Sequence, residues 1–192
     1  IAVLNVTSGP GGINALNGVY GAYTDSLPIL VISGQVKNET YLRNYKTKLR
    51  QLGDQEVDIT SMVKPITKYA ITVKDPSDIK IIMDKALYFL ENGRPGPVWI
   101  DVPIDIQGSL IDPNKLKSFD HNFKKLIKDP AISDNTRLEI LTKSNLKRKS
   151  LDKVFEKLKK SSRPVILAGT GVRISKMNKQ FLTLINKLKI PV

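Results

Sequence analysis

Two apolar runs, joined by a glycine-rich turn and a helix, constrain the fold of this chain more than any other feature. Residues 1–6 read IAVLNV, residues 27–33 read LPILVIS, and the turn after the first run reads TSGPGG at residues 7–12. A helix from residue 13 to about residue 23 completes a strand–turn–helix–strand unit. Strands that are apolar throughout are typical of parallel sheets covered on both faces. We therefore expect an α/β fold, and we interpret a chain that starts within a buried strand as a fragment.

Strands and helices continue to alternate up to residue 112. Residues 69–73 and 98–102 are predicted strands. The helix between them is expected to begin with Asp75 as its N-cap and Pro76 at its first position, and Gly93 can end it in a left-handed conformation. We predict a parallel-sheet, three-layer domain over residues 1–112. The buried face of its helix is predicted to hold Ile79, Ile82, Met83, Ala86, Phe89 and Leu90.

The rest of the chain divides into two segments. Residues 113–149 have mixed composition and weak periodicity, and we interpret them as a linker. From residue 150 a second pattern begins, with a helix at 151–158, a strand at 164–168, a turn at 169–171 and a helix at 177–188. Residues 190–192 are predicted to start another strand. We therefore expect residues 150–192 to be the start of a central α/β domain.

The formal net charge of +13 lies entirely in the later part of the chain. Residues 1–112 contain 11 Lys and Arg and 12 Asp and Glu, whereas residues 113–192 contain 20 and 6. A basic module that binds nucleic acid through residues 113–192 is therefore one hypothesis. Against it, the lysines are scattered over predicted helix surfaces without an aromatic platform, which is typical of a solvated face.

Composition excludes several classes of site. The absence of cysteine excludes disulfides, thiolate metal sites and a cysteine nucleophile. The single histidine, His121, excludes polyhistidine zinc sites, and its place in the predicted linker favours a solvated side chain. No apolar run approaches the roughly 20 residues of a membrane-spanning helix, so we expect a cytoplasmic protein without a membrane partner.

Three short motifs allow two interpretations each. The turn at residues 8–12 either presents backbone N–H groups to an anion or a cofactor ring, or is a plain tight turn. It lacks the Gly-Lys-Ser/Thr of a P-loop and the glycine spacing of a dinucleotide-binding turn. The acidic DQEVD segment at residues 54–58 is either a metal or acid–base site, or a solvated loop. The GTGVR segment at residues 169–173 either approaches a phosphate or is a plain turn, and Trp99 is expected in the core.

Five sequence blocks occur in a recognisable order. They are VTSGPGGINALNGVYGAYTDSLPILVISGQV, QEVDI, PITKYA, GRPGPVWIDVPIDIQ and RPVILAGTGVRIS. This series resembles the thiamine diphosphate-dependent enzymes of the acetolactate synthase type. The resemblance covers most of residues 1–112 and about 150–192. It implies the later part of an N-terminal pyrimidine-binding domain, a linker, and the beginning of the central domain.

The resemblance also implies site residues. Gln55 would face the substrate, with Lys68 nearby to attract a 2-oxo acid carboxylate. In members that bind FAD, Gly169, Gly171 and Arg173 match the loop that approaches it. The residues that would line the thiamine diphosphate pyrimidine pocket, at an interface between subunits, are Ser8, Gly9, Pro10, Gly11 and Asn14.

Two functional elements of the family are missing from this sequence. The glutamate that activates the cofactor would fall before Ile1, so no catalytic residue is expected here, and Glu56 is not given that role. The Gly-Asp-Gly motif that binds diphosphate and Mg²⁺ in the C-terminal domain is absent, so no metal ligand is expected. We therefore expect the chain alone to be inactive.

The resemblance implies a carboligase that decarboxylates a 2-oxo acid such as pyruvate and joins the enamine to a second carbonyl. Such an enzyme would be a homodimer or homotetramer, and nucleic acid would not be one of its partners. Two departures keep a decarboxylase or a C–C hydrolase of the same superfamily as an alternative. Asp54 stands where many acetolactate synthases have Phe, and the loop at residues 38–52 is longer than usual.

Overall fold

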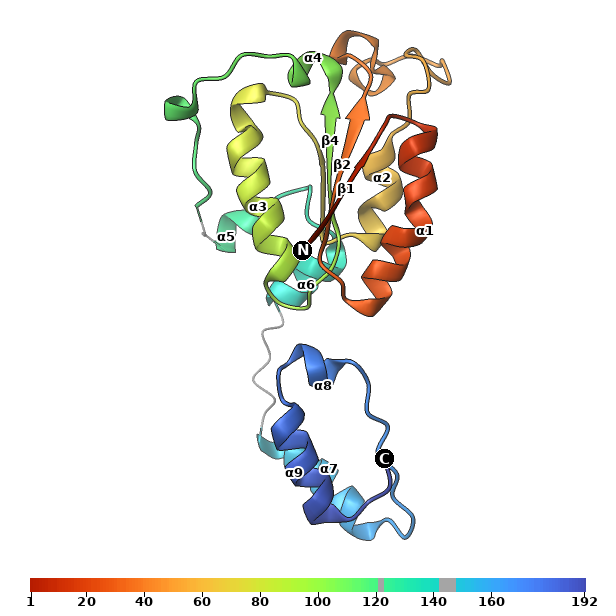
Figure 1. The fold of residues 1–192 in the computed structure, drawn as a ribbon, viewed down its shortest axis with the longest axis vertical. Helices are drawn as coiled ribbons and strands as arrows, with labels where there is room; N and C mark the ends of the chain where they lie inside the picture. The colour runs from red at the N-terminus through yellow and green to blue at the C-terminus, as the bar shows by residue number, and fades with distance from the viewer. Residues whose placement is uncertain (121–122, 142–147) are drawn as a thin grey trace. The chain divides into compact units, whose positions relative to one another are not determined.

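A computed structural model describes residues 1–120, 123–141 and 148–192, and His121 and part of the predicted linker lie outside these ranges (Figure 1). The chain forms two compact units, residues 1–142 and residues 143–192. Among the described residues, no helix combines the length and the apolar character that a membrane span requires.

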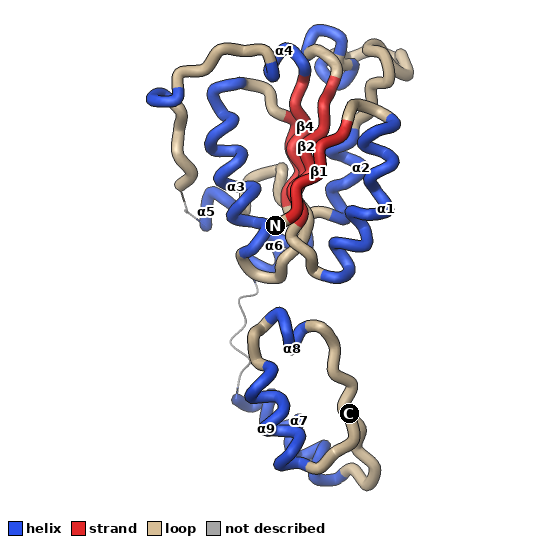
Figure 2. Tube along the Cα trace, viewed as in Figure 1, coloured by secondary structure: helices blue, strands red, loops and turns tan. Residues whose placement is uncertain are grey.

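The first unit is built on a parallel sheet of four strands. Figure 2 shows the strands lying between helices, which agrees with the predicted α/β class. The strand order is β1-β2-β4-β3. In the ladders, Ser33 of β2 pairs with both Val6 of β1 and Asp101 of β4, and Thr72 of β3 pairs with Asp101. The carboxyl ends of all four strands therefore meet at one edge of the sheet, which we call the carboxyl edge. The strands are β1 (Ala2–Val6), β2 (Ile29–Gln35), β3 (Tyr69–Thr72) and β4 (Val98–Pro103).

Helices cover both faces of this sheet, so the predicted three layers are present (Figure 1). Helices α1 (Pro10–Asp25) and α2 (Ile59–Val63) lie on one face, and α3 (Ile79–Glu91) lies on the other. Trp99 is fully buried in the core on the α1 and α2 side, as expected. Short 3-10 helices join the larger elements at Asn38–Thr40, Leu42–Asn44, Lys64–Ile66, Pro76–Asp78 and Pro113–Lys115.

Local sequence accounts for the position of α3. The Asp75 carboxylate accepts a hydrogen bond from the Ser77 N–H, and Pro76 starts the 3-10 turn that leads into the helix. Gly93 follows the helix with φ of +75°, as the sequence predicts. The predicted apolar face is also confirmed, since Ile82, Ala86, Phe89 and Leu90 are buried and Ile79 and Met83 pack against them.

The prediction that the first strand is covered on both faces is wrong. Strand β1 is an edge strand, and Ile1 and Val3 are each 64% exposed. An apolar strand favours burial, but whether it is buried depends on the elements that pack against it. Strands β2 and β4 each have a neighbour on either side, and these two central strands are mostly buried.

Part of the predicted linker belongs to the first unit. Leu126, Ala131 and Ile132 are buried in the core beside α3, and Ile132 forms an antiparallel bridge with Tyr69 at the free side of β3. The segment has weak helical periodicity because it is anchored by a few apolar residues rather than by a continuous face. Helices α5 (Phe123–Leu126) and α6 (Asp134–Leu141) lie in this segment. The short helix α4 (Ile104–Gln107) precedes it and directly follows β4.

The second unit contains the two predicted helices but not the two predicted strands. Helices α7 (Arg148–Lys160) and α9 (Asn178–Leu188) are present, with α8 (Gly171–Ile174) between them. Residues 164–168 and 190–192 have no strand conformation, although the Ile166 N–H donates to the Pro191 carbonyl oxygen at 2.9 Å. A single bond between two segments is not a ladder, and no described residue of this unit is buried.

Candidate functional site

The glycine-rich turn lies at the carboxyl edge, between β1 and α1. Gly9 has φ of 57° and ψ of −115°, a combination that only glycine adopts readily. A Cβ atom at Gly9 would overlap the carbonyl oxygen of Gln55. The turn therefore requires glycine for two independent reasons, its backbone conformation and its contact with a second loop.

The other residues of this turn lie around the start of α1. Pro10 occupies the first turn of the helix, and the Gly9 carbonyl oxygen accepts a hydrogen bond from the Ile13 N–H at 3.0 Å. Ser8 and Gly11 are half-buried, while Pro10 and Asn14 are exposed. The structure thus brings the predicted pyrimidine-pocket residues and Gln55 together at one edge of the sheet.

Gln55 is held in an uncommon conformation. Its φ of 54° lies in the left-handed region, and unlike Ser26, which ends α1, it does not cap a helix. Such residues cost free energy and persist only where their surroundings fix them. The side chain of Gln55 is exposed, so the strain orients a polar group outward beside the Gly9 turn.

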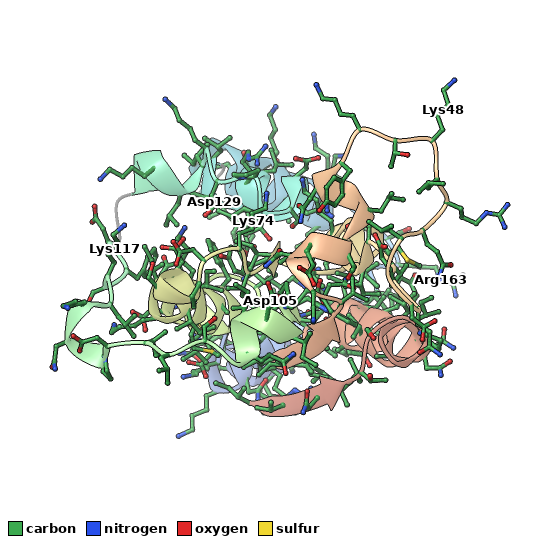
Figure 3. All side chains as sticks on the ribbon, turned by 90° about the horizontal axis from the view of Figure 1, so that it is seen from above. Lys48, Lys74, Asp105, Lys117, Asp129 and Arg163 are labelled. Atoms are coloured by element: carbon green, nitrogen blue, oxygen red, sulfur yellow. The ribbon has the colours of Figure 1, made fainter. Side chains whose placement is uncertain are left out.

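Glu56 organises the loop that carries Gln55. Its carboxylate accepts hydrogen bonds from the backbone N–H groups of Leu42 at 2.6 Å, Leu52 at 3.0 Å and Gly53 at 2.8 Å. The interpretation of residues 54–58 as a solvated acidic loop is therefore wrong for Glu56, because backbone N–H groups rather than water surround its carboxylate. Figure 3 shows Lys48 at the outer end of this long loop, directed away from the sheet.

Asp58 also has a structural role. It caps α2 by accepting from the Ser61 N–H at 3.2 Å, and it pairs with the Arg43 guanidinium at 2.6 Å. Asp54 is exposed. Over the ranges that the structure describes, no group of three or more His, Cys, Asp or Glu side chains could hold a metal ion.

Asp101 is a site residue that the sequence reasoning missed. It is fully buried in β4 and accepts hydrogen bonds from Ser33 at 2.6 Å, Gln35 at 3.0 Å and Thr72 at 3.1 Å. Burial raises the pKa of Asp101 to about 6, while these hydrogen bonds oppose the increase. The available signal was an acidic residue within the apolar strand VWIDVP, because a buried charge needs a specific reason.

A cavity of about 370 Å³ opens at the same edge, between the ends of β1 and β2. Gly34 lines it, and a Cβ atom there would make ordinary contacts, 3.7 Å from Gln107 Nε2 and 3.8 Å from the Ser8 nitrogen. It has room for a single substituted aromatic ring. Its lining is residues 5–8, Gly34, Gln35, Ile104 and Gln107.

The structure does not bring Lys68 to Gln55, so the prediction that the two are neighbours is wrong. Lys68 precedes β3, whereas Gln55 contacts the turn that follows β1. Because the strands are parallel, the two side chains lie at opposite edges of the sheet. We call the edge that holds Lys68 the amino edge.

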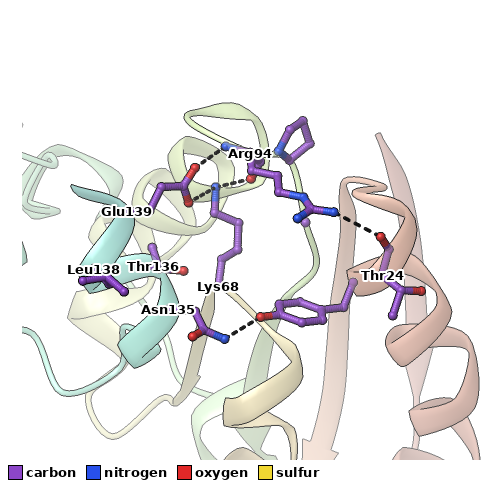
Figure 4. A pocket seen from close by; sticks show the side chains of 10 residues that line it. Thr24, Lys68, Arg94, Asn135, Thr136, Leu138 and Glu139 are labelled. Atoms are coloured by element: carbon purple, nitrogen blue, oxygen red, sulfur yellow. Dashed lines mark hydrogen bonds and ion pairs between the residues drawn. The ribbon is translucent and has the colours of Figure 1, made fainter. Parts of the chain in front are cut away.

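Lys68 is buried at this amino edge by backbone groups (Figure 4). Its ammonium donates to the carbonyl oxygens of Asn92 and Arg94, both at 2.6 Å, and lies 3.9 Å from the Glu139 carboxylate. Burial lowers the pKa of Lys68, and the Glu139 charge raises it by a smaller amount. A cavity of about 660 Å³ lies beside it, bordered also by Tyr23.

The predicted FAD loop lies in the second unit. Gly169, Gly171 and Arg173 are exposed, and Gly171 begins the short helix α8. A Cβ atom at either glycine would meet nothing within 4 Å. The turn is therefore open within its own unit, and nothing in that unit requires glycine at these positions.

Comparison with protein families gives two matches. Residues 1–62 match the model described as "Thiamine pyrophosphate enzyme, N-terminal TPP binding domain". Residues 151–192 match the model described as "Thiamine pyrophosphate enzyme, central domain". The Gly9 turn and the Gln55 loop both lie in the first matched segment.

Curated relatives resemble the chain along its whole length. The acetolactate synthase large subunit of Lactococcus lactis is 33% identical over 192 residues, which are 100% of this chain and 29% of the relative. The acetolactate synthase large subunit of Buchnera aphidicola from Acyrthosiphon pisum is 36% identical over 99% of this chain and 29% of the relative. The glyoxylate carboligase of Escherichia coli O157:H7 is 33% identical over 90% of this chain and 25% of the relative. The chain thus spans less than a third of the length of these relatives.

Proposed function

The chain belongs to the thiamine pyrophosphate enzyme family, and we propose that it supplies the pyrimidine-binding side of a thiamine diphosphate site in an acetolactate synthase-type carboligase. The observation that carries this proposal is the Gly9 turn. It combines a glycine-only backbone conformation, a contact with the strained Gln55 loop and an adjacent cavity at the carboxyl edge. In parallel α/β sheets, ligands bind outside the carboxyl ends of the strands.

The residues present fit the cofactor ring. Gly9 keeps the backbone of the turn in a place where a Cβ atom would clash, and the neighbouring cavity of about 370 Å³ suits one substituted ring. Ser8, Pro10, Gly11 and Asn14 would border the ring, and Gln55 would face the substrate. Bound thiamine diphosphate supplies a carbon nucleophile for 2-oxo acid carbonyls and an electron sink for the loss of CO₂. This chain would orient the ring and exclude water on one side of it.

The finer points of the proposal follow from the relatives. Two are acetolactate synthases and one is a glyoxylate carboligase, so a 2-oxo acid such as pyruvate is the proposed substrate class. We propose Mg²⁺ as the diphosphate-bound ion, held outside these residues, and FAD as a ligand that Gly169, Gly171 and Arg173 would approach. A homodimer or homotetramer in the cytoplasm is the proposed assembly. For Lys68, the buried position at the amino edge favours a supporting role rather than contact with the substrate.

The test uses the gene product that carries these residues, titrated with thiamine diphosphate and Mg²⁺ and assayed with pyruvate. We expect saturable cofactor binding and acetolactate formation. Gly9→Ala should weaken cofactor binding at least tenfold, because its Cβ atom displaces the Gln55 carbonyl. Gly18→Ala, in the helix α1 that follows the turn and with open space around the added atom, is the matched control and should bind as the parent does.

Two results would overturn the proposal. One is a parent protein without cofactor binding. The other is a Gly9→Ala variant that binds thiamine diphosphate as tightly as Gly18→Ala. Decarboxylation of pyruvate without ligation would instead favour the decarboxylase alternative.

A further inference from the structure

The buried carboxylate of Asp101 is the least expected group in the first unit. No cation pairs with it among the described residues, and its partners are the hydroxyls of Ser33 and Thr72 and the amide of Gln35. The Ser33 hydroxyl in turn accepts from the Trp99 indole N–H at 2.8 Å. A buried charge that depends on side-chain donors is costly to maintain, so its position calls for a reason.

Gln35 connects this carboxylate to the loop that carries Gln55. The Gln35 amide nitrogen donates both to Asp101 Oδ2 at 3.0 Å and to the Val57 carbonyl oxygen at 2.8 Å. Its oxygen accepts from the Val36 N–H at 3.0 Å. Gln35 is only 4% exposed, and both amide hydrogens are used, so the side chain has a single orientation.

The connection ends at the glycine turn. Val57 lies two residues after Gln55, and the Gln55 carbonyl packs where a Gly9 Cβ atom would be. A continuous series of contacts therefore runs from Asp101 through Gln35, Val57 and Gln55 to Gly9. It joins three elements that are distant in sequence: β4, the end of β2 and the long loop.

We propose that Asp101 is a positioning residue for the cofactor site, acting through Gln35 to hold the loop of residues 54–58 against the Gly9 turn. This inference rests on the proposed function for its link to thiamine diphosphate, but its structural part stands on the hydrogen bonds alone. A charged acceptor forms stronger hydrogen bonds than a neutral one, so the ionised carboxylate fixes Gln35 most firmly.

The charged and titratable groups near Asp101 define its electrostatic setting. Burial is the main cause that raises the pKa of Asp101, and the Asp58 charge adds to it. Burial also raises the pKa of Tyr41 most, with smaller contributions from the charges of Asp58 and Asp101. The Arg43 guanidinium pairs with Asp58 and also faces the Tyr41 hydroxyl, where it opposes the increase of the Tyr41 pKa. Around neutral pH the carboxylate is ionised, and protonation near pH 6 weakens its hold on the Gln35 amide.

The structural arm of the test is amide hydrogen exchange in the 192-residue chain between pH 5 and 7.5, corrected for intrinsic rates. The reporters are the amides of Leu42, Leu52 and Gly53, which the Glu56 carboxylate holds. Asp101→Asn should increase their exchange at least threefold and remove its pH dependence, because the charge is lost while the shape is kept. Gln35→Leu should increase it tenfold or more, and combining both variants should add little.

Thr72→Val is the matched control, since it removes a donor to the same Asp101 oxygen and leaves Gln35 in place. Amides within β2 and β4 serve as the internal measure of folding. Loop amides that exchange as slowly in Asp101→Asn as in Thr72→Val, at every pH, would overturn the inference.

The cofactor arm is read in the full gene product. Asp101→Asn should raise the thiamine diphosphate concentration needed for half-maximal activity more than it lowers kcat. If the parent binds no cofactor, the proposed function fails while the exchange data still decide whether Asp101 holds the loop. If the parent binds cofactor and the variant binds it equally well, the positioning role fails alone.

Discussion

The two edges of the sheet each bury one charged side chain, and they hold it by different means. At the carboxyl edge, Asp101 is bound by three side chains from two other strands, Ser33, Gln35 and Thr72. At the amino edge, Lys68 is bound by two backbone carbonyls from the turn after α3. Backbone partners are fixed by the fold, whereas side-chain partners link separately placed elements.

This difference indicates that the amino edge supports the fold, whereas the carboxyl edge positions a loop beside the candidate site. The amino edge ties the start of β3, the turn before β4 and α6 into one unit, with Glu139 accepting from the Arg94 N–H (Figure 4). The carboxyl edge links a sheet interior to a loop that borders a cavity. We therefore expect changes at the amino edge to act on stability and changes at the carboxyl edge to act on site geometry.

The largest effect is expected for Lys68→Met. Methionine keeps the apolar stem of the side chain but removes the ammonium that donates to the carbonyls of Asn92 and Arg94. The buried ammonium makes both hydrogen bonds, and a hydrogen bond to a charged group contributes about 1.5–3 kcal/mol, so the free energy of unfolding of the first unit should fall by about 3 kcal/mol. Urea denaturation followed by tryptophan fluorescence measures this, because Trp99 is the only tryptophan and is fully buried.

Lys46→Met is the control for this prediction. Lys46 is exposed on the long loop, so its replacement should change the free energy of unfolding by less than about 0.5 kcal/mol. Equal stability of the two variants would contradict a supporting role for the amino edge.

The second prediction concerns pH, and the two edges should respond with opposite sign. Because the pKa of Asp101 is raised to about 6 in the folded chain, its protonated form stabilises the fold fully below about pH 4. That contribution, about 3 kcal/mol for a shift of about 2 pKa units, is lost as the pH rises through 6. The pKa of Lys68 is lowered, so its contribution instead improves as the pH rises toward the ordinary lysine value.

Stability curves from pH 4 to pH 10 for the parent, Asp101→Asn and Lys68→Met separate these contributions. The parent minus Asp101→Asn difference should fall between pH 4 and pH 7. The parent minus Lys68→Met difference should be flat there and rise only in the alkaline range. A constant difference for Asp101→Asn over the acid range would show that the carboxylate does not titrate in the fold.

Much of the fold followed from local sequence. The βαβ unit, the cap at Asp75 and the Gly93 terminus depend on nearest neighbours, and all are present. The exposure of β1 and the missing strands at residues 164–168 and 190–192 could not be predicted in this way, because burial and ladder formation depend on which neighbours exist. The burial of Ile132 depends on a bridge to Tyr69, which lies 63 residues earlier.

The candidate site was predicted unevenly for the same reason. The glycine turn has a signature in consecutive residues, so Gly9 and its neighbours could be identified from sequence. Lys68 was placed at the wrong edge because its position depends on the direction of β3, which the motif does not encode. Asp101 was missed because its partners lie 66 and 68 residues away on β2 and 29 residues away on β3.

The smallest effect is expected for Glu139→Gln, which separates the contribution of the ion pair from that of the backbone carbonyls. The glutamine oxygen can still accept from the Arg94 N–H, so the change removes only the charge that faces Lys68 at 3.9 Å. Glu139 is 38% exposed and solvent screens the pair, so the loss of stability should be about 0.5 kcal/mol or less. The pKa of Lys68 should nevertheless fall further, because the Glu139 charge is what raises it. An NMR titration of the Lys68 ammonium beside urea denaturation tests both points. If Glu139→Gln costs as much as Lys68→Met, the ion pair rather than the backbone carbonyls holds the amino edge together, and the contrast with the side-chain network of Asp101 is lost.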